Sequence, residues 1–336
     1  MVSLQHSIIA GLFAFFCVAV VVFSQVGNWN TVEFQSSGDS NSGDLINRES
    51  YFSKVNYFKF RKGIPFLHLQ AFELNISTLT KKTIFLNPKG MVFTNKGVPI
   101  NYQGQQGIFF KNKEELFLEK EVTVKMKNST IASDKMVYKF SSDQIISTGG
   151  VESSSRSERT GDVIQILSDK AIFWPKSSKS KYLGNVQGEV KRGKVYEENV
   201  SFKSDRLRLD LGRHKMELYD NVSFLKQELS ARSRRGEVFL ENYNKKLKYF
   251  VLYDDVKVIE QVVPKGSRKG YTREAFAEKL EGLISENKVI LTGRPKVFQQ
   301  KDIIKGNRIV LRKNNEVIEV EEAITIFDRN RKKKGK

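Results

Sequence analysis

A short pattern recurs along the chain and limits what it can fold into. Three segments start with Ser-Asp-Lys or Ser-Asp-Arg and end eighteen positions later in a valine that follows a turn of Gly, Asn or Asp: Ser133–Val151, Ser168–Val186 and Ser204–Val222. Looser copies place the closing valine at steps of 29 to 41 residues, at Val92, Val122, Val151, Val186, Val222, Val256 and Val297. Because a unit this short cannot bury its own apolar face, neighbouring units must stack into one continuous body.

Within each repeat, apolar and polar residues alternate with a period of two. Leu207, Leu209 and Leu211 are each separated by a single charged residue. Such alternation predicts strands that are buried on one face and solvated on the other. The expected fold class is therefore all-β, with an elongated body of stacked strands beyond Tyr51.

One stretch of the body has a different spacing. In Arg273–Ile284, the apolar residues Phe276, Leu280 and Leu283 recur at helical intervals. The segment lies where the repeat requires a strand, and we predict a strand there because the repeat is the stronger signal.

Composition excludes several classes of protein. The 336 residues include one cysteine and three histidines, which are too few for a disulfide framework, a Cys-based zinc site or a His-rich metal centre. We find no catalytic constellation, and so predict neither an enzyme nor a cofactor. The 57 Lys and Arg against 38 Asp and Glu give a net charge of +19, which suits an anionic partner such as nucleic acid, a membrane surface or an anionic lipid.

The N-terminal segment predicts a membrane association. Ile8–Phe23 is an uncharged apolar run that would cover about 24 Å as a helix, and with its flanks it approaches the ~30 Å hydrocarbon layer. We predict a transmembrane signal anchor at residues 1–27, although a cleaved signal peptide is an alternative. A flexible polar linker at 28–50 and a basic disordered tail at 328–336 complete the predicted organisation around the exported body.

Several segments of the body resemble a known family. They are GIPFLHLQAFEL (63–74), NPKGMVFTNKG (87–97), INYQGQQGIFFKNKEELFLEKEVTV (100–124), the repeats ending in GGV and GNV, ARSRRGEVFLE (231–241) and LTGRPKVFQQKDIIKGNRIVLRKNNEVIEVEEA (291–323). Their order resembles the lipopolysaccharide-transport (Lpt) bridge proteins, which have OstA-like domains. Residues 57–195 are similar to LptC, and residues 196–326 are more similar to LptA. We therefore predict an LptC-like domain at residues 51–195 and an LptA-like domain at residues 196–327. Of the family's Ala-x-x-Gly, only the glycine is retained, as Gly107, since Gly104 replaces the alanine.

The resemblance implies a fold, a function and partners. The fold would be an open β-jelly-roll, here two joined in one chain as in an LptC–LptA fusion. The protein would sit in the inner membrane by a single pass with its C-terminal body in the periplasm. It would accept lipopolysaccharide from an ABC transporter complex like LptB/LptF/LptG and pass it along a hydrophobic groove. An LptA-like or outer-membrane LptD-like jelly roll would receive the lipid.

Residues on the inward parity of the strands are the candidate lipid contacts, because acyl chains need a dry apolar trough. They are Phe93, Leu118, Val122, Val124, Met136, Tyr138, Phe173, Leu207, Leu209, Phe224, Val238, Val256, Val258, Ile309 and Leu311. The alternative for each of them is ordinary packing in a closed core.

Basic clusters are candidate contacts for the phosphates of a lipid headgroup. The cluster that we select is Arg232, Arg234 and Arg235, and two others lie at Lys191–Lys194 and Lys265–Lys269. Solvated surface charge that guards edge strands is the alternative interpretation.

Two other functions compete with lipid transfer. A structural or adhesive surface fibre could be built from the same β repeats without any lipid groove. A nucleic-acid binder would explain the charge, but an exported body that lacks a recognisable binding motif opposes that interpretation.

Overall fold

The computed structural model describes most of the body. The described residues are 49–94, 97–158, 161–193, 199–226, 229–240, 247–262, 270–283, 288–300, 302–312, 318–322 and 324–326. The predicted anchor, linker and basic tail lie outside these ranges, except that Glu49 and Ser50 begin the first strand. Among the described residues, no helix is long and apolar enough to cross a membrane.

The described residues form 22 strands and no helix, so the all-β prediction is confirmed for this part of the chain. The first eleven strands are β1 (Glu49–Arg61), β2 (Ile64–Ser77), β3 (Lys82–Leu86), β4 (Lys89–Phe93), β5 (Pro99–Gln103), β6 (Gln106–Phe110), β7 (Glu115–Met126), β8 (Ser129–Lys139), β9 (Gln144–Arg156), β10 (Val163–Trp174) and β11 (Lys179–Lys191). The others are β12 (Val200–Asp210), β13 (Lys215–Lys226), β14 (Leu229–Leu240), β15 (Leu247–Val262), β16 (Tyr271–Leu283), β17 (Lys288–Thr292), β18 (Lys296–Gln299), β19 (Asp302–Lys305), β20 (Arg308–Arg312), β21 (Ile318–Glu321) and β22 (Ile324–Ile326).

The antiparallel sheet divides into two walls. The division is clearest at the two ends of the sheet, where one long strand pairs with two different short strands. One half of β2 pairs with β4 and the other half with β3; the two paths meet again on β7 through β5 and β6. At the other end, β16 pairs with both β17 and β18. We call the wall that contains β3, β6, β17 and β20 the first wall, and the wall that contains β4, β5, β18 and β19 the second.

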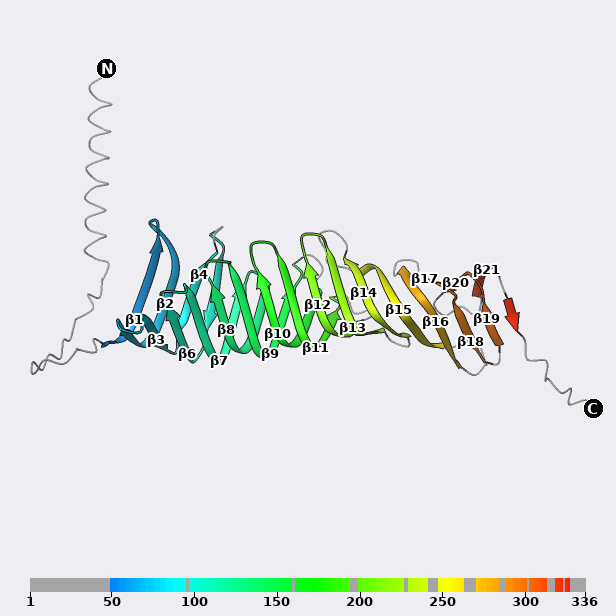
Figure 1. Cartoon of the computed structure of the whole chain (residues 1–336), viewed down its shortest axis with the longest axis horizontal. Helices are drawn as coiled ribbons and strands as arrows, with labels where there is room; N and C mark the ends of the chain where they lie inside the picture. The colour runs from blue at the N-terminus through cyan, green and yellow to red at the C-terminus, as the bar shows by residue number, and fades with distance from the viewer. Residues whose placement is uncertain are drawn as a thin grey trace, which may run out of the picture. The chain divides into compact units, whose positions relative to one another are not determined.

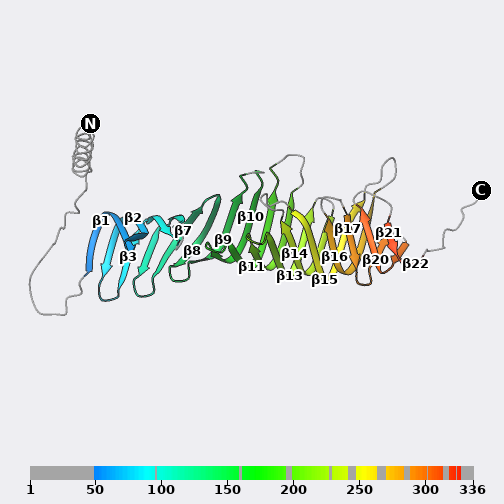
Figure 2. The ribbon, with the colours of Figure 1, turned by 90° about the horizontal axis from the view of Figure 1, so that it is seen from above.

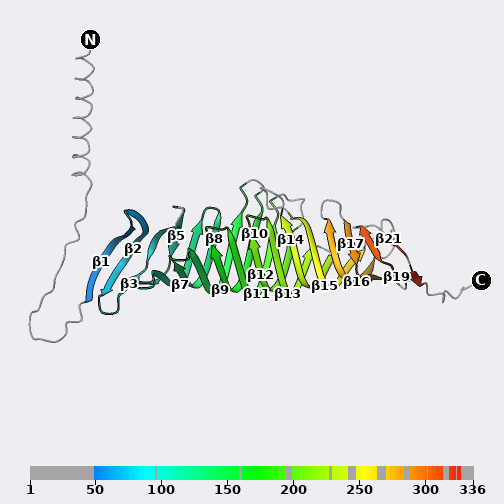
Figure 3. The ribbon, with the colours of Figure 1, turned by 45° about the horizontal axis from the view of Figure 1, so that its top comes forward.

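Each long strand from β7 to β16 contributes to both walls. These strands pair with their neighbours in chain order, and Figure 1 shows that order along the long axis of the body. On β7, one half pairs with β6 and so lies in the first wall, and the other half pairs with β5 and so lies in the second. The antiparallel registers carry this division from β7 to β8 and on to each later long strand. Figures 2 and 3 show the two sets of strands crossing one another, which is a jelly-roll-like arrangement.

The closing turns of the sequence repeat are the corners where strands pass from one wall to the other. Adjacent residues with positive φ precede the closing valine in β7, β9, β11, β13 and β15, as in Gly184–Asn185 before Val186. Opposite such a pair, the neighbouring strand has a single residue, here Asp205, so the register shifts. An extra residue of this kind is a β-bulge, which bends a strand and increases its twist.

The Ser-Asp-Lys part of the repeat fixes the same corners from the intervening strands. The serine hydroxyl donates to the backbone carbonyl oxygen two residues later, over 3.0–3.1 Å, in each of four strands: Ser133, Ser168, Ser204 and Ser233. The acidic residue then accepts from the corner of the next strand, as when Asn185 donates to Asp169 over 2.9 Å. The repeat therefore encodes corners rather than a binding motif.

Strand pairing continues across the predicted boundary at residue 195. β11 and β12 are paired from Lys179–Asp210 to Val190–Val200. The segment with helical spacing is also in the sheet, since β16 pairs with β15 from Tyr271 to Leu283, apart from one register shift. The strand prediction for Arg273–Ile284 is therefore confirmed up to Leu283, and Ile284 lies outside the described residues. The chain from residue 47 onward forms one compact unit, and the division into an LptC-like and an LptA-like part stays a prediction.

Candidate lipid groove

An apolar interior lies between the two walls. Alternate residues of every long strand face it, so that Leu118 of the first wall and Val124 of the second are both at most 1% exposed. The walls are joined through the strands at the corners. On the opposite side, which we call the seam, β13 and β14 are joined within the second wall and β14 and β15 within the first. Among the described residues, strands therefore close the interior at the corners and not along the seam.

Most predicted groove residues lie in this interior. Thirteen of the fifteen belong to the buried core: Leu118, Val122, Val124, Met136, Tyr138, Phe173, Leu207, Phe224, Val238, Val256, Val258, Ile309 and Leu311. Leu209 is partly buried and packs against that core. Burial places these side chains correctly, while their contact with lipid stays a prediction.

The inward assignment is wrong for Phe93. Its neighbour Val92 is 2% exposed and belongs to the core, whereas Phe93 is only half-buried. Successive side chains of a strand point to opposite faces, so Phe93 and Val92 cannot both face the interior. The larger aromatic side chain was a misleading signal at this position.

Two pockets open onto the interior, and both are lined from both walls. The first has a volume of about 340 Å³, and its lining includes the predicted groove residues Phe173 and Leu209. It also has hydroxyl groups, since the Ser153 and Tyr182 oxygens lie 3.0 Å apart within it.

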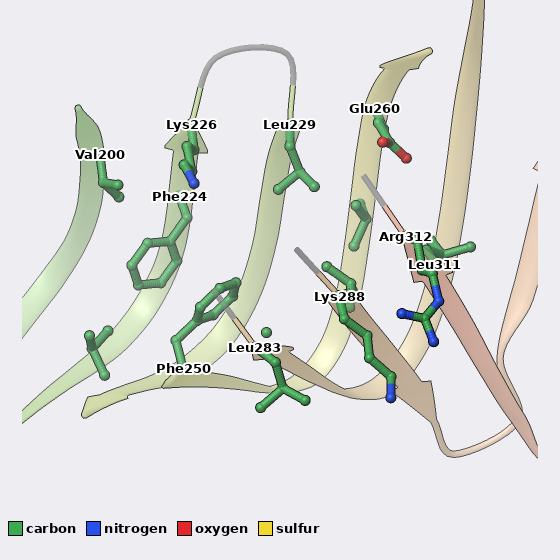
Figure 4. A pocket seen from close by; sticks show the side chains of 14 residues that line it. Val200, Phe224, Lys226, Leu229, Phe250, Glu260, Leu283, Lys288, Leu311 and Arg312 are labelled. Carbon is green, nitrogen blue, oxygen red and sulfur yellow. The ribbon is translucent and has the colours of Figure 1, made fainter. Parts of the chain in front are cut away.

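The second pocket, which we call the slot, is narrower, at about 90 Å³, and almost wholly apolar (Figure 4). It contains four predicted groove residues: Phe224, Val238, Val258 and Leu311. Three cations, Lys226, Lys288 and Arg312, lie at its rim.

Aromatic rings and cations meet near the start of the body. Phe66, Tyr138 and Phe140 pack edge to face, with centroids 4.6–5.0 Å apart. The Lys59 Nζ lies 3.9 Å from the centroid of the Phe109 ring, and burial lowers the pKa of Lys59 below its usual value. Such an arrangement stabilises a cation over a π face.

An ion pair is buried beside the slot. Arg273 of β16 and Glu260 of β15 face each other across the strands, with an Nη1–Oε2 distance of 3.2 Å, and their side chains are 1% and 8% exposed. Gln299 accepts a second bond from Arg273 Nε at 2.9 Å. Sequence reasoning missed this pair, although two charged residues at inward parity, next to Val258 and Ala275, were the available signal.

The basic residues selected from the sequence lie on the outer surface. Arg232 is exposed, Arg234 pairs with Asp255 at 2.5 Å, and Arg235 lies 4.3 Å from the centroid of the Tyr253 ring. Arg234 and Arg235 are at a corner, on the side of the walls away from the seam. The Lys265–Lys269 cluster lies outside the described residues, and a role of any of these side chains in phosphate binding stays a prediction.

The two glycines of the family motif have different surroundings. A β-carbon at Gly107 would lie 3.0 Å from both Leu118 and Pro88, which is tighter than ordinary packing. At Gly104 the nearest atom would be the Glu119 carbonyl oxygen at 3.5 Å, an ordinary contact. The structure thus has room for alanine at the first position, whereas at the second a β-carbon would require Leu118 and Pro88 to shift.

Within the described ranges, no group of three or more His, Cys, Asp or Glu side chains could hold a metal ion. The described side chains of the interior are mostly apolar, with a few hydroxyl and charged groups such as Ser153, Tyr182, Glu260 and Arg273.

No curated protein matches the sequence. One of 14 matching solved chains is LptH from Pseudomonas aeruginosa, described as the LptA homologous periplasmic component of the lipopolysaccharide transport device. The two sequences are 10% identical and the TM-score is 0.34. The match covers 38% of this chain and 94% of LptH. The family model of LptC-related lipopolysaccharide-assembly proteins matches residues 15–161. Over these residues the chain is similar to the LptC-related family.

Proposed function

We propose that the protein is a bridge component for lipopolysaccharide transport. It accepts lipopolysaccharide from an inner-membrane ABC transporter and passes it along the interior between the two walls. The observation that carries this proposal is the apolar interior itself, which extends from Leu67 in β2 to Leu311 in β20 in a chain whose first part is LptC-related.

The energetics of the interior favour passive transfer. Each methylene group that leaves water contributes about 0.8 kcal/mol, so an acyl chain is held strongly by a continuous apolar surface. Equivalent apolar residues recur in successive strands, such as Leu207, Leu218 and Leu252, which are each 0% exposed. Because neighbouring positions along the interior are chemically alike, a chain can shift by one strand with little change in free energy.

The two ends of the body would receive the partners. Within the described part, β1 pairs only with β2, so its other edge presents backbone groups to a partner strand. Its outer face carries Phe58 and Phe60, 47% and 59% exposed. We assign this end to the transporter complex and the end formed by β21 and β22 to an LptA-like or LptD-like jelly roll, with the body in the periplasm and an N-terminal anchor in the inner membrane.

Site-specific photo-crosslinking in cells tests lipid transfer. Crosslinking groups at the inward positions Leu118, Val124 and Val258 should capture lipopolysaccharide, and capture should require ATP hydrolysis by the transporter. The adjacent positions Phe117, Thr123 and Lys257, which face outward, are the matched controls and should capture little. Capture at none of the inward positions would contradict lipid transfer and favour a structural fibre.

Co-purification tests the partner assignment. An ABC transporter should accompany the full chain from detergent-solubilised membranes. Loss of the transporter on substituting Phe58 and Phe60 together by serine would assign the contact to the β1 end, whereas unchanged recovery would place the contact elsewhere.

A further inference from the structure

Hydroxyl groups interrupt the apolar interior at β9 and β11. On β7 and on β13 every buried residue is apolar, as at the equivalent positions Leu118 and Leu218. Four buried residues of β9 and β11 instead carry a hydroxyl group, and we call them the hydroxyl belt: Ser147, Ser153, Ser180 and Tyr182. The belt therefore separates two apolar stretches of the interior.

Two members of the belt are hydrogen-bonded from one wall to the other. Ser153 belongs to the second wall and Tyr182 to the first, and their paired neighbours on the adjacent strands are apolar core residues. The two oxygens lie 3.0 Å apart, and the residues are 8% and 3% exposed. This bond, which we call the bridge, joins the walls across the interior.

The other bonds of these hydroxyls run within one wall. Ser153 Oγ donates to the Ile166 carbonyl oxygen over 3.4 Å, and Ser180 bonds to the Tyr182 hydroxyl from the next inward position of β11. Ser147 is 0% exposed, and its hydroxyl has no hydrogen-bond partner among the described residues. The belt thus has one bond that separation of the walls would break, and one hydroxyl that no described protein group satisfies.

The pocket of about 340 Å³ lies beside the bridge. Ser153 and Tyr182 both line it, together with Ile164 and Leu209, which are only partly buried. The exposed Asn128, in the turn between β7 and β8, is also part of the lining, so the pocket opens to solvent. Its volume falls within the range of about 300–1,000 Å³ that is usual for ligand pockets. A ligand in this pocket would lie against the bridge.

We propose that the hydroxyl belt is a selectivity filter for the lipid. An acyl chain passes between Ser153 and Tyr182 when it carries an ester or amide carbonyl group that replaces the bond of the bridge. This inference rests on the proposed function and adds which amphiphiles the interior admits.

The filter acts through the separation of a buried hydrogen bond. A plain alkyl chain between Ser153 and Tyr182 would break their bond and offer no other, which is unfavourable for hydroxyl groups in an apolar surrounding. A carbonyl oxygen accepts a bond from a hydroxyl, so the exchange is more nearly balanced. A site built to hydrogen-bond its ligand discriminates against an analogue without the bonding group for the same reason.

Equilibrium binding of two lipid probes to the full chain, held in uncharged detergent, tests the filter. The probes are monomyristoyl glycerol and its ether analogue, monotetradecyl glycerol, which has the same chain length but no carbonyl group. Trp174 lines the pocket, so its fluorescence reports occupancy once W29F has removed the other tryptophan. This W29F protein should bind the ester about tenfold more tightly than the ether.

The double variant S153A/Y182F, made in the W29F protein, removes both hydroxyls of the bridge. The preference for the ester should then vanish, mainly because the ether binds more tightly when there is no bond to break. S201A/Y219F, which removes a serine and a tyrosine hydroxyl from outward positions of β12 and β13, is the matched control and should keep the preference. Circular dichroism checks that each variant is folded.

Other outcomes separate the possible failures. An unchanged preference in S153A/Y182F, or none in the W29F protein, would overturn the filter, as would an equal loss in the control. Weaker ester binding in S153A/Y182F with unchanged ether binding would contradict the exchange of the bridge. Failure of both probes to change the Trp174 fluorescence would also overturn the filter. In each case, lipopolysaccharide capture at Leu118 and Val124 in cells would still support the proposed function, and only its absence would contradict that function.

Discussion

The ring of Phe202 occupies the space that a side chain at Gly188 would need. The two residues are paired across β11 and β12, and a β-carbon on Gly188 would overlap the end of the Phe202 ring. Phe202 is 2% exposed, and its centroid is 6.3 Å from that of Phe224, so it begins a row of rings that continues to Phe250 in the slot. The missing side chain at Gly188 thus allows a large aromatic residue inside the groove.

The substitution Gly188→Ala should therefore destabilise the protein. The Phe202 ring must leave its position, and overpacking of this kind costs about 1–3 kcal/mol in the free energy of unfolding. Gly104→Ala is the control, because its β-carbon has 3.5 Å of clearance, and it should leave stability unchanged or slightly raised. Urea unfolding followed by circular dichroism measures both. Equal effects of the two substitutions would contradict the packing argument.

The corner serines should contribute to stability individually. Ser168→Ala removes the hydrogen bond from its hydroxyl to the Lys170 carbonyl oxygen and should lower the free energy of unfolding by about 0.5–1.5 kcal/mol. Ser204→Ala, at the equivalent position, should cost a similar amount. Ser201→Ala is the control, since Ser201 lies near the start of β12, outside the corner, and is only partly buried. If the control costs as much as the corner substitutions, the hydrogen bond is not the cause.

The ion pair of Glu260 and Arg273 should behave as a buried pair. Arg273→Met removes the buried cation that faces the Glu260 carboxylate, which should cost about 3–5 kcal/mol. The double variant E260L/R273M should recover most of that loss, because it leaves no uncompensated charge. Thermal unfolding of the two variants measures the difference. Equal stability of the single and double variants would show that the pair is not coupled.

Stability should fall at alkaline pH because of buried tyrosines. Burial raises the pKa of Tyr102 and Tyr182, and burial together with the Asp143 carboxylate raises the pKa of Tyr138. A phenol with a raised pKa in the folded state contributes stability that is present below the unfolded value of about 10 and is lost as pH rises above it.

Unfolding at pH 9 and pH 11 measures this loss, and the decrease should be smaller in Tyr138→Phe. In parallel, absorbance at 295 nm should show part of the 11 tyrosines, Tyr102, Tyr138 and Tyr182 among them, ionising above the unfolded value. If all 11 ionised together near pH 10 without unfolding, the burial of these phenols would be contradicted.

Period-two alternation predicted much of the fold and the burial of most candidate groove residues. Leu118, Val122 and Val124 were placed correctly because a strand has only two faces and the apolar residues mark the inner one. The same rule failed at Phe93, where the short strand β4 holds several apolar residues in succession and the pattern no longer shows which face is inside. The strand at Tyr271–Leu283 was predicted from its position in the repeat, although its apolar residues have helical spacing. Pairing with the neighbouring strand, and not local spacing, determines the secondary structure of this segment.

The repeat was visible in the sequence, but its meaning was not. Ser-Asp-Lys and the Gly-Asn or Asp-Asn turns proved to be the two sides of a corner, in which Ser168 and Asp169 on one strand face Gly184 and Asn185 on the next. Sequence spacing alone does not reveal this partnership, because the residues that meet are about sixteen positions apart.

The sequence by itself determined that the chain forms stacked strands with one apolar face, because alternation and repetition are local properties of the polypeptide. The charged residues that flank the groove were decided only by tertiary structure. Lys226, Lys288 and Arg312 are far apart in sequence and belong to no basic cluster, yet the pairing of β17 with β20 and the approach of the two walls bring them to one rim. Arg232, Arg234 and Arg235 form a cluster in sequence but lie outside, because the corner turns that part of β14 away from the seam.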